Sequence, residues 1–133
     1  MQGKHIFEYA VIRVVPRVER EEFINVGVIL YCRALDFLQA KCMPDEKRLL
    51  AFAPQLDMRE IKNNLDALCH ISKGDEKSGP IGKLSLPERF RWLTATRSTV
   101  VQSSKVHSGF CDDAAETLER LFNQLVSLDE DQT

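Results

Sequence analysis

The feature that most constrains the fold is the nearly continuous apolar run at residues 26–32, VGVILYC. Such a run is typical of a central strand whose two faces are both buried. Residues 6–15 precede it and alternate, which predicts another strand ended by Pro16. Residues 37–43 alternate again after a tight link at 33–36. Three successive antiparallel strands therefore form the predicted skeleton of the first half of the chain.

Helix signals follow these strands. Asp45 after Pro44, the capping-box patterns of Asp57 and Ser85, and Asp112 or Asp113 each predict a helix start. Residues 118–126 carry the clearest amphipathic pattern. We expect an α+β fold, with an antiparallel sheet of three to four strands packed against helices on one or both faces. The predicted strands span about 5–15, 25–33, 37–43 and 99–107, and the predicted helices about 45–53, 57–70, 86–94 and 113–128.

The chain of 133 residues is large enough for one domain with its own core, and residues 1–133 show no second core. The stretch at about 72–84 holds three of the six glycines, which predicts an exposed, mobile loop. The acidic residues from 129 onward predict a frayed tail. No apolar run is long enough to cross a membrane and the start lacks a signal-peptide cleavage site, so we expect a cytoplasmic protein.

Charge and motifs exclude several function classes. Residues 83–107 hold five basic residues against one acid, whereas 108–133 hold one basic residue against seven acids. This balance disfavours general nucleic-acid binding and leaves only a local contact. The four cysteines are widely spaced, so we expect buried or idle thiols, no metal and no cofactor. Phosphate-loop, dinucleotide, zinc-protease and EF-hand motifs are missing from the sequence.

The first candidate site is the connection PRVEREEFINVGVI at residues 16–29, together with Arg13. Arg13 and Arg17 offer planar forks for phosphate or carboxylate, and Asn25 can donate and accept hydrogen bonds. Gly27 within a strand predicts a bulge or the close approach of another backbone. The alternative is a short solvated turn of helix in which Glu22 and its neighbours form local ion pairs.

The second candidate site is residues 97–113, where Arg97, Ser98, Gln102, His107 and Asp113 come close together in sequence. Gly109 is expected to permit a turn before the last helix. His107 is a candidate general acid, general base or ligand, and the alternative is a strand histidine with one ordinary hydrogen bond. A Ser-His-Asp hydrolase triad is disfavoured because the sequence has no nucleophile elbow. Trp92 is expected to pack in the core, with base stacking as the alternative.

Several motifs give the chain a family resemblance. They are YAVIRVVP at 9–16, E-x-x-NVGVIL at 22–30, FRWLTATRSTVVQ at 90–102, VHSG at 106–109, and the acidic pair at 112–113. This combination resembles a bacterial family catalogued as domain of unknown function 3037. The resemblance implies a small stand-alone bacterial protein, often encoded beside a HipA-like kinase, which suggests a partner. No established activity comes with it, and the segment here has Thr96 where a proline is expected before the arginine. The family positions carried over as candidates are Arg13, Glu22, Asn25, Gly27, Arg97, Ser98, Gln102, His107, Gly109 and Asp113.

Three functions remain open from the sequence. The favoured one is a binding or accessory protein that regulates a HipA-like kinase. The second is an enzyme acting on a phosphate ester or nucleotide, with Arg13 and Arg97 holding the anion and His107 exchanging a proton. The third is local nucleic-acid binding through Arg89, Arg91, Arg97 and Lys105. We also expect the two candidate segments to converge at one end of the sheet and form a polar cleft.

Overall fold

Five antiparallel strands form one sheet, which carries all the candidate segments. The computed structural model describes residues 3–97 and 99–127. β2 lies between β3 and β1, and both β4 and β5 pair with the other side of β1. The strands are β1 His5–Val14, β2 Ile24–Cys32, β3 Phe37–Cys42, β4 Val101–Ser103 and β5 His107–Cys111.

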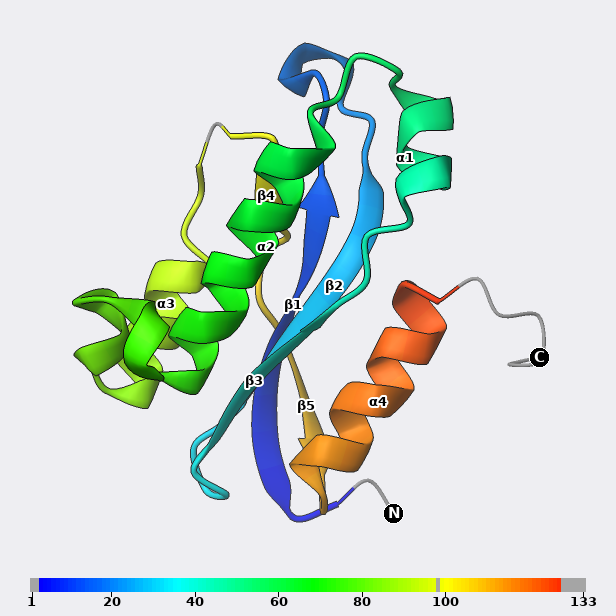
Figure 1. Cartoon of the computed structure of the whole chain (residues 1–133). Helices are drawn as coiled ribbons and strands as arrows, with labels where there is room; N and C mark the ends of the chain where they lie inside the picture. Colours follow the sequence, from blue (N-terminus) through cyan, green and yellow to red (C-terminus); the bar gives the residue numbers. More distant parts are fainter. Residues whose placement is uncertain (1–2, 98, 128–133) are drawn as a thin grey trace.

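Helices cover both faces of this sheet, so that the chain forms three layers (Figure 1). α1 Glu46–Phe52, α2 Met58–Lys73 and α3 Leu86–Leu93 pack on one face, and α4 Ala114–Leu125 packs on the other. Three short 3-10 turns are η1 Val18–Arg20, η2 Glu76–Ser78 and η3 Ile81–Lys83. The predicted α+β class with an antiparallel sheet is confirmed. No helix in the described part of the chain is long and apolar enough to span a membrane.

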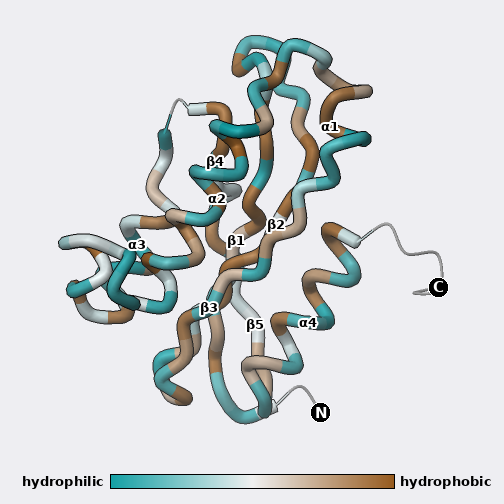
Figure 2. The backbone as a smooth tube through the Cα atoms, viewed as in Figure 1, coloured by the Kyte–Doolittle hydropathy of each residue, from teal (hydrophilic) through white to brown (hydrophobic). Residues whose placement is uncertain are grey.

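The central strand β2 is buried on both faces, as its apolar run predicts. Ile29 and Tyr31 join the apolar cluster under α1, α2 and α3, whereas Val28 and Leu30 join the cluster under α4. Figure 2 shows the same arrangement, with mostly brown central strands and helices that alternate between brown and teal. A strand that contributes to two clusters couples the three layers.

A β-bulge interrupts the pairing of β1 with β2. Ile12 pairs with Gly27 and Arg13 pairs with Asn25, so that Val26 is the extra residue. A Cβ atom at position 27 would lie 2.7 Å from the Sγ atom of Cys42 and 2.8 Å from the carbonyl oxygen of Lys41. The bulge and the close backbone approach predicted from Gly27 are therefore both confirmed.

The edge strand beside β1 differs from the prediction, because the expected strand at 99–107 is two strands. Ser104 separates β4 from β5, and its side chain is buried. Its N–H donates to the carbonyl oxygen of Val11 at 2.8 Å, and its Oγ accepts from the N–H of Val11 at 2.8 Å. The turn predicted at Gly109 is wrong, because Gly109 lies inside β5 opposite Phe7.

The segment at 72–84 has a defined path in the structure. It follows α2 through Gly74 and then forms η2 and η3, with Ser72, Ser78 and Gly82 buried. The side chain of Arg89 donates to the carbonyl oxygens of Gly82 and Leu84 at 3.1 and 3.0 Å. The mobility of this segment stays a prediction. The last helix ends at Leu125, and the tail expected from 129 lies outside the described residues.

Candidate functional site

Three candidate residues lie in one row across the sheet. Arg13 on β1 pairs with Asn25 on β2 and with Gln102 on β4. Paired residues of antiparallel strands place their Cβ atoms on the same face. That face carries α4, because the neighbouring Ile12 belongs to the cluster on the opposite face. The structure thus brings together residues from both candidate segments, although only at this row.

Arg13 is a cation without a counter-charge in the described part of the chain. Its guanidinium carbon lies 3.8 Å from the centre of the Phe23 ring, which is a cation–π contact. Its Nε is buried and has no hydrogen-bond partner among the described residues, and no described acid forms an ion pair with it. Desolvation by burial lowers the pKa of Arg13. The part of the Arg13 side chain that stays accessible can receive an anion.

Asn25 is fixed by the end of α4. Its Nδ2 donates to the carbonyl oxygen of Leu125 at 3.1 Å, which orients the amide. Its Oδ1 is buried and has no partner among the described residues. A buried polar atom without a hydrogen bond costs about 1–3 kcal/mol. Two such atoms, the Nε of Arg13 and the Oδ1 of Asn25, lie in this row.

The charged connection itself is largely a solvated turn. The Nε of Arg20 donates to the Oε1 of Glu22 at 2.6 Å, and both side chains are exposed. This hydrogen bond lowers the pKa of Glu22. Arg17 is exposed just before η1 and makes no cap hydrogen bond. The alternative interpretation of this segment is a short helical turn with local ion pairs. It is confirmed for Glu22, which pairs with Arg20 beside η1.

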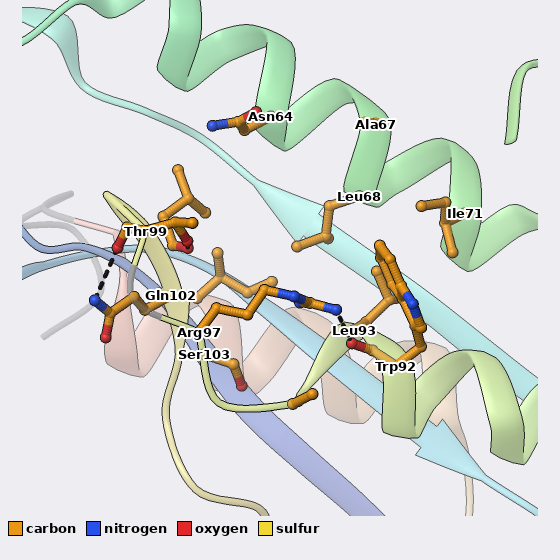
Figure 3. Close-up of a pocket in the computed structure, with 13 residues that line it drawn as sticks. Asn64, Ala67, Leu68, Ile71, Trp92, Leu93, Arg97, Thr99, Gln102 and Ser103 are labelled. Atoms are coloured by element: carbon orange, nitrogen blue, oxygen red, sulfur yellow. Dashed lines mark hydrogen bonds between the residues drawn. The ribbon is translucent and has the colours of Figure 1, made fainter. Parts of the chain in front are cut away.

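Arg97 lies on the opposite face from Arg13. Its Nη2 donates to the carbonyl oxygen of Trp92, and its guanidinium carbon lies 4.2 Å from the centre of the Trp92 ring. Both residues line a cavity of about 220 Å³ between α2 and the 95–103 segment (Figure 3). Trp92 is 40% exposed, so its expected place in the core is wrong. Phe90 and Leu93, on either side of it, fill the core position instead.

His107 stands apart from both arginines. It pairs with Tyr9, and the two ring centres are 5.3 Å apart. Tyr9 and Arg13 are four residues apart on β1, which corresponds to about 13 Å along a strand. His107 and Arg13 therefore cannot act on the same atom of a small substrate, and the predicted polar cleft is not formed.

The remaining candidates have structural positions. Asp113 caps α4, since its Oδ1 accepts from the N–H of Glu116 at 3.1 Å. Gly109 leaves room for Phe7, because a Cβ atom there would lie 2.8 Å from the Cζ of that ring. Gln102 donates from Nε2 to the carbonyl oxygen of Thr99 at 2.8 Å. Ser98 lies outside the described residues.

Sequence reasoning missed two aromatic partners and one thiol pair. Phe23 and Trp92 each stack on a candidate arginine. Phe23 could have been found from its spacing, because it lies two residues before Asn25 and so shares its strand face. The Sγ atoms of Cys42 and Cys69 are 4.0 Å apart, and no spacing in the sequence signals this contact. Within the described residues no group of three His, Cys, Asp or Glu side chains could hold a metal ion.

Comparison with known proteins gives one match. A family model described as "Protein of unknown function (DUF3037)" matches residues 9–126. The matched range includes the Arg13 row, the Arg97 cavity, His107 and Asp113. No curated protein and no solved structure matches the chain significantly.

Proposed function

The chain belongs to the DUF3037 family, and from that membership we propose a binding protein whose Arg13 receives a carboxylate of a protein partner. The proposed partner is the HipA-like kinase that the family resemblance suggests. The observation that carries the proposal is the half-buried Arg13, stacked on Phe23 without a described acid beside it. A guanidinium forms short, strong, charge-assisted hydrogen bonds with carboxylates. A partner's Asp or Glu would supply the charge that the row lacks.

A protein is the favoured occupant because of the residue types exposed here. Phe23 is 43% exposed beside Arg13. Arginine and aromatic residues are enriched at the energetic centres of protein interfaces. The arrangement suits a partner surface with a carboxylate next to apolar atoms.

The two other functions have less support in the geometry. An enzyme using Arg13 and Arg97 together would need them on one face of the sheet, and they lie on opposite faces. Local nucleic-acid binding would need free basic side chains in the 83–107 segment. Arg89 donates to two backbone carbonyl oxygens and Arg97 donates to one, which leaves Lys83, Arg91 and Lys105 as exposed charges.

Binding measurements with a HipA-like kinase, the proposed partner, test the proposal. The full chain is titrated against the purified kinase, and the dissociation constant is measured by calorimetry. Arg13→Gln removes the charge and is expected to weaken binding by about ten-fold or more. Phe23→Ala removes the stacked ring and is expected to weaken it by a similar factor. Arg13→Lys keeps the charge but loses the planar fork, so an intermediate loss is expected.

Arg59→Gln is the matched control, because Arg59 is an exposed arginine of α2 on the opposite face. Its dissociation constant should stay within about two-fold of the wild-type value. If Arg13→Gln and Arg59→Gln weaken kinase binding equally, the loss of affinity comes from bulk charge. That result would contradict the proposed site. A wild-type protein that does not bind the kinase would contradict the proposed partner.

A further inference from the structure

The cavity on the α2 side is built mainly from hydrocarbon. Its walls come from α2, the end of α3, β1 and the 95–103 segment, and its volume is about 220 Å³ (Figure 3). An engineered apolar cavity of about 150 Å³ is known to hold benzene. The space therefore fits one ring or a short alkyl chain together with a small polar group. The aliphatic lining residues are Ile12, Ala67, Leu68, Ile71, Leu93, Ala95 and Val101, and Trp92 adds an aromatic ring.

Arg97 gives this cavity its polarity. It is the one charged side chain among the described lining residues, and no described acid pairs with it. Of its five N–H donors, the structure shows one in use, on the carbonyl oxygen of Trp92. Figure 3 shows the side chain extended along the cavity with its guanidinium next to Trp92. An apolar space with one unpaired cation suits a ligand with one negative charge.

Trp92 and Asn64 add to this chemistry. Trp92 borders the cavity and is 40% exposed, although tryptophan, a large residue, is on average highly buried. Asn64 lines the opposite side of the cavity with a polar side chain. The indole ring thus contributes apolar surface beside the guanidinium of Arg97, which lies 4.2 Å from the ring centre.

We infer that this cavity is a binding site for a small monocarboxylic acid with an apolar ring or short alkyl body. The carboxylate accepts hydrogen bonds from Arg97, and the apolar body lies among Leu68, Ile71 and Leu93. A carboxylate is favoured over a phosphate dianion because the lining holds a single cation. The cavity lies on the opposite face from Arg13, so the inference does not depend on the proposed function.

The single tryptophan of the chain makes the site directly observable, because Trp92 borders the cavity. The probe is cyclohexanecarboxylate, which does not absorb where tryptophan is excited. We expect a saturable change in Trp92 fluorescence during the titration. Its neutral counterpart, cyclohexylmethanol, should bind about ten-fold or more weakly because it has no charge for Arg97. Acetate should also bind weakly, because it has almost no apolar body.

Two variants make the test specific. Arg97→Gln should weaken the binding of cyclohexanecarboxylate by about ten-fold or more. The weak binding of the alcohol should stay within about two-fold of its wild-type value. Ala67→Leu places extra atoms in the cavity from an exposed helical position and should weaken both probes. Because leucine is a good helix former, this variant is expected to fold even where Arg97→Gln is not stable enough to measure.

The matched control is Arg91→Gln, since Arg91 is an exposed arginine next to Trp92 that does not line this cavity. Its titration should match the wild type within about two-fold. Three results would each overturn the inference. They are no saturable signal with the acid, equal affinity for acid and alcohol, and equal losses in Arg97→Gln and Arg91→Gln.

Discussion

At the scale of single residues, the thiols of Cys42 and Cys69 form a contact between two chemically reactive groups. Their Sγ atoms lie 4.0 Å apart, on β3 and α2. A hydrogen bond with Cys42, with Lys73 and His70 nearby, lowers the pKa of Cys69 to about 7. The same contact and burial raise the pKa of Cys42. Cys69 is therefore the more acidic thiol of the pair.

This difference predicts the pH dependence of alkylation. Because the thiolate is the nucleophile, iodoacetamide should label Cys69 with a half-maximal rate near pH 7, below the range of an ordinary thiol at about 8.5. The rate rises as pH increases through that value. Cys42→Ala removes the hydrogen-bond partner of Cys69 and should move the midpoint of the labelling rate upward by about one pH unit. Mass-spectrometric peptide mapping measures the rate at each cysteine. A wild-type midpoint above about 8.5, or one that Cys42→Ala leaves unchanged, contradicts the assignment.

Residue types could be chosen from the sequence, but their neighbours could not. Arg13, Asn25 and Gln102 were candidates because of their donors and acceptors, and their pairing depends on a bulge that shifts the register by one residue at Gly27. A shift of one residue reverses the face of every later side chain. Arg97 and His107 are ten positions apart in sequence, and a strand break between them puts them in different surroundings. Their separation follows from tertiary hydrogen bonds that no local pattern encodes.

At the scale of elements, the break between β4 and β5 depends on one hydroxyl group. The side chain of Ser104 occupies the position of a backbone acceptor for the N–H of Val11. Val11 is buried, so this donor has no access to water. The edge strand can therefore leave the sheet at Lys105 and Val106 without leaving β1 unsatisfied.

Ser104→Ala tests this role. The variant leaves the N–H of Val11 buried without an acceptor, and the free energy of unfolding should fall by about 1–3 kcal/mol. Hydrogen exchange of the Val11 amide should become faster than that of its neighbours in β1. Ser103→Ala is the control, because its hydroxyl donates only to the adjacent carbonyl oxygen, and it should cost about 0.5 kcal/mol or less. Equal losses in the two variants would contradict the role given to Ser104.

Helix starts were the most predictable elements. Asp45, Asp57, Ser85 and Asp113 all cap the helices that they predict, and Ser85 with Glu88 forms a complete capping box. Capping depends on residues three positions apart, so the sequence contains the whole interaction. The edge strands were less predictable, because their extent depends on a partner about ninety residues away along the chain.

At the scale of the whole molecule, one sheet serves two apolar clusters. Alternate residues of β2 point into the cluster under α4 and into the cluster under α1, α2 and α3. A substitution that destabilises the packing on either face therefore also destabilises the strands that the other face packs against. We expect the described layers to unfold as one cooperative unit.

Leu118→Ala tests this coupling from the α4 side. Leu118 is 1% exposed, and the truncation should lower the free energy of unfolding by about 2–5 kcal/mol. Trp92 lies on the opposite side of the sheet, and its fluorescence should show the same shift of the denaturant midpoint as circular dichroism. Gln124→Ala, at an exposed position of α4, is the control and should leave both midpoints within error. A Trp92 transition unmoved by Leu118→Ala would show that the two faces unfold independently.

The three-layer arrangement could be predicted in outline because β2 is apolar at nearly every position. A strand of that kind needs cover on both faces, and four capped helices supply it. The assignment of helices to faces could not be predicted, since every helix in the set is amphipathic and fits either side. α4 is the helix packed on the face that carries Arg13, and Arg13 contacts the exposed ring of Phe23.

The broken edge of the sheet has a consequence for self-association. An unbroken exposed strand offers a row of backbone groups to a second chain and promotes fibril-like stacking. Here the exposed edge consists of pieces of three and five residues, with the exposed Lys105 between them. Neither piece is long enough to template the addition of a full foreign strand. The hydroxyl group that divides the edge thus also protects the protein against amyloid-type growth from this side.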